Sequence, residues 1–263
     1  MKYVLVTGAY GGMGKATVNA LANAGYFVFA LDKKTGERTD NVLPIETDLT
    51  DGESVARALE QVRAVTDELY AIAHFAGIYV LNSLLEISDE TFCKAFDVNL
   101  FGAFRVNKAF APLLKRGSRI LITTSELAPL DPLPFTGVYA VTKSALDKYA
   151  YSLRMEMQLL GVSVSVLRAG AVATDMLGVS TTALDKFCES TQIYSCNAKR
   201  FKGVVDRVEA RKVPPEQVAK KVLKALGCKR PKYVYTLNRN PLLLLLNALP
   251  ARLQTWIIGK ILK

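Results

Sequence analysis

The chain is poor in the residues that hold metals and in long apolar runs. It contains one histidine, His74, and four scattered cysteines with no Cys-x-x-Cys pair. A structural zinc site is therefore not expected, and a reducing cytosol is the simplest compartment. The first apolar stretch lacks the basic segment and cleavage site of a secretory signal peptide, so none is predicted. Five consecutive leucines at residues 242–246 are too few to cross a bilayer.

Acidic residues are scarce between residues 196 and 232. Twelve Lys and Arg stand there against three Asp and Glu, in a chain of net charge +10. Nucleic-acid binding is one interpretation, but no recognised nucleic-acid module accompanies the charge. A solvated basic helical face, or attraction to an anionic substrate or membrane surface, is favoured instead. We therefore expect no nucleic-acid partner.

A short apolar run, a glycine cluster and a helical pattern follow one another at the start of the chain. Residues 4–6 are Val-Leu-Val, and Gly8, Gly12 and Gly14 give the spacing Gly-x-x-x-Gly-x-Gly. Strand, glycine turn and helix in this order suit a nucleotide pyrophosphate, because glycine permits close approach and a helix N-terminus offers free N–H groups. A glycine turn alone is weak evidence, so the rest of the chain must supply a cofactor site.

Six further strand-like segments alternate with helical patterns. They lie at residues 26–31, 42–46, 69–75, 118–124, 162–168 and 232–237. This order predicts an α/β fold, a single Rossmann-type doubly wound domain over residues 1–240 with a seven-stranded parallel sheet. Ligands bind such sheets at the carboxyl ends of the strands. The glycine turn, Asp32, Gly77 and Ser125 are all expected at that edge.

Asp32 ends the second predicted strand and is placed to bind the adenosine ribose hydroxyls. A carboxylate there repels a 2′-phosphate, which favours NAD over NADP, although Lys33 and Lys34 follow and could soften that preference. The alternative is that Asp32 caps a turn before Gly36. Asp48, after the third strand, is expected to meet the adenine.

Two polar residues interrupt otherwise regular patterns. Asn99 lies within a helical run from 88 to 114, where asparagine is a poor helix former, so a kink or a polar site is expected. His74 lies at a strand end and is predicted to be structural rather than a catalytic base.

Tyr139 and Lys143 are four residues apart at a predicted helix start and therefore share a face. Tyrosine ionises near pH 10, but an adjacent cation favours the phenolate and should lower that pKa. Tyr139 could then exchange a proton with an alcohol or carbonyl while hydride moves to or from a nicotinamide. Ser125, delivered by the fifth strand, would hold the substrate oxygen.

Together these residues resemble the short-chain dehydrogenase/reductase family. The match comprises Thr7-Gly8-x-x-x-Gly12-x-Gly14, Asp48, Val98-Asn99 before Gly102, Ser125 and Tyr139-x-x-x-Lys143. The resemblance implies an active tetrad of Asn99, Ser125, Tyr139 and Lys143, with Asn99 anchoring a water that links Lys143 to solvent. It also implies a cofactor-binding set made up of Thr7, Gly8, Gly12, Met13, Gly14, Asp32, Asp48, Leu49, Ala76, Gly77, Tyr139, Lys143 and Thr174.

Within this resemblance, Thr174 corresponds to the threonine that contacts the nicotinamide carboxamide. Gly11 stands where NADP-preferring members often carry a basic residue, which again favours NAD. Three positions depart from the family pattern. Residues 74–77 read His-Phe-Ala-Gly in place of Asn-Asn-Ala-Gly, and Ala169 replaces the proline before Gly170. Ser125 precedes Tyr139 by 14 residues, one more than expected, which leaves Thr124 as a weaker substitute for Ser125.

Residues 177–212 carry no strand signal and are predicted to form a helical substrate lid. Residues 241–263 form an apolar and basic amphipathic tail in which Leu253, Trp256, Ile257 and Ile261 are expected to face one way. Such a helix suits a membrane surface, but docking on the chain's own core or on another subunit is equally supported. The protein is expected to be cytoplasmic, with membrane association through the tail as one option.

The sequence therefore predicts an NAD-dependent oxidoreductase that interconverts a secondary alcohol and a ketone. The apolar lid and tail suggest a lipophilic substrate, and the resemblance adds hydroxysteroid or retinol-like alcohols as candidates, together with a homodimer or homotetramer. An NADPH-dependent carbonyl reductase is one alternative. A non-catalytic NAD-binding regulator on the same fold is another.

Overall fold

Seven parallel strands form one sheet in the order β3-β2-β1-β4-β5-β6-β7. The computed structural model describes residues 1–208 and 212–263, and within helix α6 the side chains of residues 175–181 lie outside that description. The strands are β1 (Lys2–Thr7), β2 (Tyr26–Asp32), β3 (Val42–Glu46), β4 (Leu69–His74), β5 (Leu114–Thr123), β6 (Ser163–Ala169) and β7 (Val234–Leu237). The predicted doubly wound α/β fold with a seven-stranded parallel sheet is confirmed.

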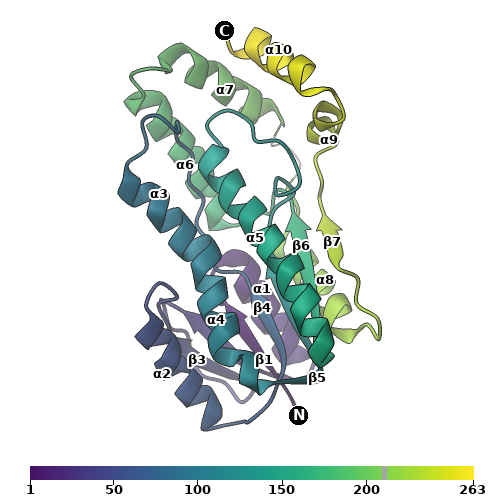
Figure 1. Ribbon diagram of the computed structural model, residues 1–263. Coiled ribbons are helices and arrows are strands. Elements are labelled where there is room, and N and C mark those ends of the chain that lie inside the picture. Colours follow the sequence, from purple (N-terminus) through teal and green to yellow (C-terminus); the bar gives the residue numbers. More distant parts are fainter. Residues whose placement is uncertain (209–211) are drawn as a thin grey trace.

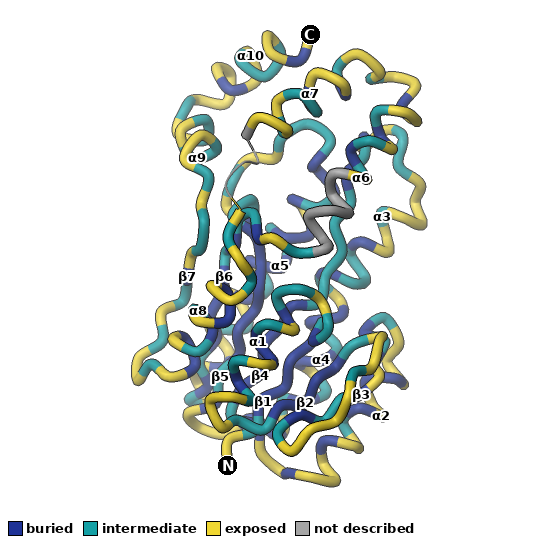
Figure 2. The backbone as a smooth tube through the Cα atoms, turned by 180° about the vertical axis from the view of Figure 1, so that it is seen from behind, coloured by how far each residue is buried: buried dark blue, intermediate teal, exposed yellow. Residues whose placement is uncertain are grey.

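Helices cover both faces of the sheet (Figure 1). One face carries α1 (Gly12–Asn23) and α8 (Pro215–Gly227), and the other carries α2 (Gly52–Arg63), α4 (Gly102–Phe110) and α5 (Gly137–Met157). Successive strand residues alternate between two apolar cores: Val4 and Val6 pack on the α1 side, whereas Leu5 packs on the α5 side. Both layers bury the sheet, which explains the nearly continuous apolar strands (Figure 2).

The remaining helices gather mainly beyond the carboxyl edge of the sheet (Figure 1). They are α3 (Asp89–Phe96), α6 (Asp175–Ser190), α7 (Ser195–Val208), α9 (Pro241–Asn247) and α10 (Ala251–Leu262). Helices α6 and α7 occupy most of the predicted lid, of which residues 209–211 lie outside the described residues. Leu184, Phe187 and Phe201 of these two helices form a third apolar core with Leu262 of α10. Among the described residues, no helix is long and apolar enough to span a bilayer.

The predicted interruption at Asn99 is a π-helical turn, η1 (Asp97–Phe101), between α3 and α4. Ser88 caps α3 by accepting a hydrogen bond from the Thr91 N–H. Pro112 lies in the short 3-10 turn η2 (Ala111–Leu113), which ends the helical run before β5. A second 3-10 turn, η3 (Gln158–Leu160), ends α5.

His74 joins three elements of the core. Its Nδ1 lies 3.4 Å from the Thr7 hydroxyl on β1, and its Nε2 lies 3.0 Å from Oδ1 of Asn107 on α4. The Asn107 amide nitrogen donates in turn to the Tyr149 hydroxyl on α5, so its oxygen is the acceptor and Nε2 carries the proton. These contacts agree with the predicted structural role of His74.

Burial lowers the pKa of His74 to about 4, although the hydrogen bond to Asn107 works in the opposite direction. The unfolded chain, with an ordinary histidine pKa, binds the extra proton between about pH 6.5 and 4, whereas the folded protein does not. Stability contributed by neutral His74 is therefore complete above pH 6.5 and is lost as the pH falls towards 4.

We predict that the free energy of unfolding of the wild type falls more steeply over this pH range than that of a His74→Asn variant. The difference between the two slopes should accumulate to about 3 kcal/mol, from 1.4 kcal/mol per pKa unit. Urea unfolding at a series of pH values measures it. Carboxylates titrate in both proteins, so their contribution cancels in the difference between the two. If the free energy of unfolding has the same pH dependence in both proteins, His74 does not stay neutral in the fold.

Candidate active site

The first glycine turn leaves the sheet where β1 and β4 lie side by side. Gly8 has φ +65°, and a Cβ added to it would lie 2.5 Å from the Ala76 nitrogen. A Cβ on Gly14 would collide with the Gly8 carbonyl oxygen. Helix α1 begins immediately afterwards, with Gly11 at its N-cap and no side chain capping it. Close backbone packing and open N–H groups fit the pyrophosphate of a dinucleotide.

Asp32 lies against this turn. Its Oδ2 accepts a hydrogen bond from the Tyr10 N–H at 2.9 Å, so the carboxylate is at the carboxyl end of β2 beside the glycines. Lys33 turns away from it and pairs with Asp48, with Nζ and Oδ2 2.8 Å apart. The charge of Lys33 is thus directed to another carboxylate, and the ribose contact of Asp32 stays a prediction.

Asp48 holds the loop after β3. Burial raises the pKa of its carboxyl, but hydrogen bonds from Lys33 and Thr50 outweigh that effect and lower the pKa to about 2. The adjoining Leu49 is buried and packs where Gly102 leaves room, since a Cβ on that glycine would lie 3.1 Å from Leu49. Both residues are at the sheet edge expected for the adenine, and the adenine contact itself stays a prediction.

The four residues of the predicted tetrad come together from three elements. Ser125 follows β5, Tyr139 and Lys143 lie in the first two turns of α5, and Asn99 lies on η1. Ser125 and Tyr139 line the same cavity, and Ser125 favours the Tyr139 phenolate as a hydrogen-bonding partner. Thr124, the alternative to Ser125, instead lies 3.3 Å from the carboxylate of Asp147 in the core. The extra residue between Ser125 and Tyr139 therefore leaves Ser125 in place.

Asn99 is fixed by three hydrogen bonds made by its side chain. It accepts from the Ile78 N–H at 2.7 Å, and it donates to the Ile78 carbonyl and the Thr142 hydroxyl, both at 3.0 Å. A Cβ on Gly77 would lie 3.2 Å from Asn99 Oδ1 and 3.3 Å from Lys143 Nζ. A glycine at this position thus keeps the space between amide and ammonium open. The predicted water relay through Asn99 stays a prediction.

The pKa values of the Tyr139–Lys143 pair correct one expectation. Burial raises the pKa of Tyr139 to about 12, against the lowering effect of the Ser125 hydrogen bond. Burial also lowers the pKa of Lys143 to about 8. Lys143 Nζ lies 5.8 Å from the Tyr139 ring centre and 3.4 Å from the Thr123 carbonyl oxygen. The expected lowering of the tyrosine pKa by Lys143 was wrong, because desolvation by burial is the largest effect on Tyr139 and raises its pKa.

Met13 and Thr174 connect the glycine turn with the cavity beside Tyr139. Both line the cavity beside Tyr139, and a Cβ on Gly12 would lie 2.5 Å from the Thr174 methyl carbon. The loop after β6 therefore reaches the glycine turn, as the predicted carboxamide contact of Thr174 requires. That contact stays a prediction.

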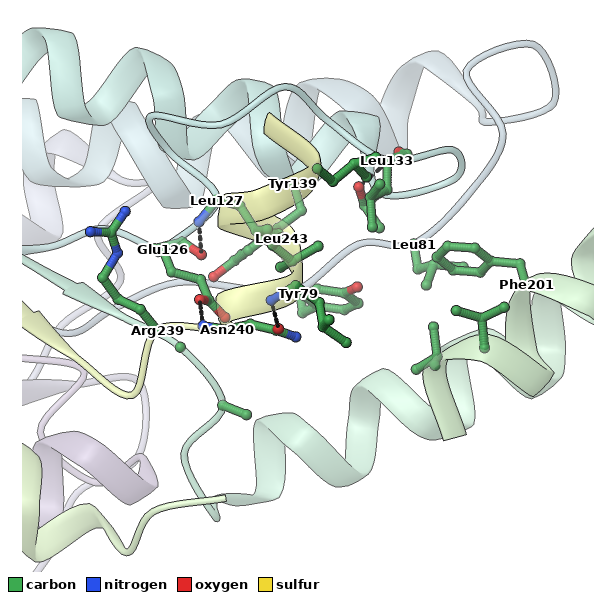
Figure 3. Close-up of a pocket in the computed structure, with 18 of the residues that line it drawn as sticks. Tyr79, Leu81, Glu126, Leu127, Leu133, Tyr139, Phe201, Arg239, Asn240 and Leu243 are labelled. Atoms are coloured by element: carbon green, nitrogen blue, oxygen red, sulfur yellow. Dashed lines mark hydrogen bonds between the residues drawn. The ribbon is translucent and has the colours of Figure 1, made fainter. Parts of the chain in front are cut away.

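A cavity of about 810 Å³ opens beside Ser125 and Tyr139. Its walls come from the loops after β4, β5 and β6 and from α6, α7, α9 and α10 (Figure 3). Most of its lining is apolar and includes Leu81, Leu133, Leu184, Phe201, Leu243, Leu246 and Ile258. The Tyr79 ring lies 4.8 Å from that of Tyr139 and forms part of the same wall.

Sequence reasoning missed Tyr79, Glu126 and the contribution of the tail to this cavity. Glu126 follows Ser125 directly, and its Oε2 accepts a 2.6 Å hydrogen bond from the Asn240 N–H at the start of α9 (Figure 3). Burial raises the pKa of Glu126, while that hydrogen bond and the charge of Arg239 act against the rise. Glu126 could have been found from its position directly after Ser125. Its contact with Asn240 could not, because no local sequence pattern links two residues more than a hundred positions apart.

Known proteins share both the sequence pattern and the fold. The family model described as "short chain dehydrogenase" matches residues 2–185. An uncharacterized oxidoreductase of Escherichia coli, YbbO, is 32% identical over 266 residues, covering 98% of this chain and 94% of that protein. The 3-ketodihydrosphingosine reductase of Bacteroides thetaiotaomicron is 25% identical over 228 residues, covering 81% of this chain and 85% of its own length.

A solved short-chain dehydrogenase from Burkholderia cenocepacia, in complex with NADP, superposes with a TM-score of 0.74 at 23% identity. The match covers 100% of both chains, which shows that the fold is the same throughout. With the matching family model over residues 2–185 and the glycine turn, Ser125, Tyr139 and Lys143 gathered at one sheet edge, the chain belongs to the short-chain dehydrogenase/reductase family of oxidoreductases.

Proposed function

We propose that this enzyme interconverts a secondary alcohol and a ketone on a lipophilic substrate, with NAD as the preferred cofactor. The observation that carries the proposal is that Ser125 and Tyr139 lie together in the wall of a largely apolar cavity that also reaches the glycine turn. The glycine turn and the open start of α1 fit a dinucleotide, which supplies or accepts hydride when bound.

The protein's own residues handle the proton. In the reducing direction the Tyr139 phenol donates its proton to the substrate oxygen as the carbonyl carbon becomes tetrahedral, and Ser125 orients that oxygen by a hydrogen bond. In the oxidising direction Tyr139 takes the hydroxyl proton back. Lys143, buried beside Asn99, places a positive charge near the phenolate that forms. Neutral Tyr139 suits proton donation at neutral pH.

The cavity favours a substrate with a long apolar part. Leucine, isoleucine and phenylalanine side chains supply most of its walls, and its size exceeds what a small alcohol requires. The 3-ketodihydrosphingosine reductase, whose substrate by name is a ketone, supports a ketone of lipid character. Steroid and retinoid alcohols remain candidates of the same apolar class.

NAD is preferred in this proposal because Asp32 presents a negative charge beside the ribose position. Lys33, the cation most able to offset that charge, is paired with Asp48. A 2′-phosphate near Asp32 would therefore meet repulsion. The NADP complex of the Burkholderia cenocepacia protein supports the alternative, an NADPH-dependent carbonyl reductase.

Tyr139→Phe tests whether the protein is an enzyme or a cofactor-binding regulator. We predict a kcat loss of about 10²–10⁴-fold with retained cofactor binding, because only the proton donor is removed. Turnover with a panel of lipophilic ketones and cofactor titration by fluorescence measure the two effects. Tyr151→Phe, on an exposed part of the same helix, is the matched control. Equal turnover in both variants would refute the assigned role of Tyr139.

The two directions of the reaction should respond differently to pH. Alcohol oxidation needs the phenolate, and burial raises the pKa of Tyr139 to about 12, so oxidation should accelerate by up to about tenfold per pH unit above neutrality. Ketone reduction needs the neutral phenol and should not accelerate. Initial rates from pH 6 to 10 in both directions provide the measurement, and a rise in reduction with pH would contradict the proposal.

Asp32→Ser tests the cofactor preference. The wild type should have the higher kcat/KM with NAD, and the variant should shift the NADP/NAD ratio towards NADP by at least about tenfold, because a like-charge contact is removed. Asp67→Ser makes the same change of net charge at an exposed position away from the glycine turn. A wild-type preference for NADP would overturn the Asp32 argument and favour the carbonyl-reductase alternative.

The apolar cavity predicts a dependence on chain length. In a homologous series of aliphatic ketones, kcat/KM should rise by up to about fourfold per added CH₂ until the cavity is filled. Leu246→Asn, in the cavity wall, should flatten that slope, whereas Leu245→Asn, the exposed neighbour on the same helix, should not. Identical slopes in the two variants would place the substrate elsewhere.

A further inference from the structure

Helix α10 presents two different apolar faces. On one side Gln254 and Leu262 are buried, and Ile258 packs with Leu262 against the lid core of α6 and α7. On the other side Leu253 is 41% exposed and Trp256, the only tryptophan of the chain, is 60% exposed. Ile261 is also exposed, at 51%, whereas Ile257 is half-buried, and both contribute to the edge of the cavity.

Helix α9 repeats this division on a smaller scale. Leu243 and Leu246 line the cavity, whereas Leu245 is 64% exposed and points away from it. The pair of helices is held to the domain by polar contacts, because the Asn247 side chain accepts the Asp131 N–H at 2.6 Å and Gln254 donates to the Asp131 carboxylate at 3.3 Å. The exposed residues therefore belong to a docked segment with a fixed orientation.

Positive charge surrounds the exposed apolar residues. Residues 241–263 contain Arg252, Lys260 and Lys263 and no Asp or Glu. All three basic residues are exposed, and spacings of four and seven place them on the Trp256 side of α10. Neighbouring α7 adds the exposed Lys199 and Arg200. An exposed tryptophan with leucines, bordered by Lys and Arg, is the composition of a helix that lies in a membrane interface.

We propose that the outer face of α9 and α10 docks on an anionic membrane surface, with Trp256, Leu253 and Leu245 entering the headgroup region and Arg252, Lys260 and Lys263 contacting lipid phosphates. The absence of acidic residues from residues 241–263 favours lipid over a second copy of the chain. A two-fold dimer through this face would oppose two sets of like charges, whereas an anionic bilayer neutralises them.

The same two helices separate this face from the substrate cavity. Leu243, Leu246 and Ile258 form the inner wall, and Leu245 and Trp256 form the outer surface. Docking would therefore place the cavity wall against the bilayer, and a lipophilic substrate could pass from lipid to Ser125 and Tyr139 without crossing water. This second part rests on the proposed function, whereas the docking itself does not.

Co-sedimentation of the full chain with vesicles tests the docking. Vesicles that contain phosphatidylserine should pellet the protein, pure phosphatidylcholine vesicles should do so weakly, and 1 M salt should release it, because the Debye length then shrinks to about 3 Å. Trp256 fluorescence should shift to shorter wavelength on binding, and the signal has one source in this chain.

Two variants and a matched control separate the contributions. Arg252→Gln/Lys260→Gln/Lys263→Gln should weaken binding to anionic vesicles by about fivefold per residue, or about a hundredfold in total. Leu245→Ser/Leu253→Ser should weaken binding to both vesicle types. The control is Leu159→Ser/Leu160→Ser, which removes two exposed leucines, 78% and 63% exposed, from the turn η3 that ends α5. It should bind vesicles like the wild type.

None of the substituted residues lines the cavity, so turnover of a short water-soluble ketone should be unchanged in all these variants. If the wild type does not turn over any such ketone, the result would count against the proposed function and leave the docking intact. Docking is refuted if the tail variants and the α5 control sediment alike. It is also refuted if the tail variants convert a dimer to a monomer by light scattering with no change in vesicle binding, since a second copy then covers this face.

Discussion

Close approach of backbones between β1 and β4 is the constraint on which the site depends. Gly8 leaves β1 in a left-handed conformation and passes the Ala76 backbone at a distance that admits no side chain. That contact puts the start of α1 beside the loop that follows β4. The same loop carries Gly77, whose missing side chain leaves room for Asn99 and Lys143. The glycine turn and the proton-handling residues therefore lie on the same tightly packed pair of loops. His74 links the two strands that precede these loops, β1 and β4, to α4.

Burial also shifts the pKa values of the reactive residues. Tyr139 and Lys143 are both pushed towards their neutral forms, because the cavity floor removes water from them and offers each few polar partners. A neutral tyrosine is a proton donor. A lysine whose pKa is close to neutral pH gains or loses its proton when a charge is placed beside it. The apolar cavity proposed to accommodate a lipophilic substrate thus also tunes the acid–base pair.

Local pattern predicted the elements of the fold well, because short apolar runs, glycine turns and helical spacing are set by neighbours in sequence. The interruption at Asn99 was predicted on the same basis, whereas its bonds to Ile78 and Thr142 depend on packing between distant elements. Lys33 was expected to soften the choice of cofactor, but its partner Asp48 lies on another strand's loop. The tyrosine pKa was misjudged for a related reason, since sequence reveals a nearby lysine but not how much water burial excludes.

The tail shows how far one amphipathic pattern can mislead. A surface helix usually buries one apolar stripe and exposes polar residues elsewhere. Helix α10 instead carries Ile258 and Leu262 towards the lid and Leu253 and Trp256 towards solvent, so its apolar residues serve two surfaces. Packing on the enzyme and contact with a membrane, which the sequence presented as alternatives, are compatible because they use opposite sides of the same helix. A cavity wall that is only one helix thick is also the shortest connection between an apolar substrate site and a bilayer.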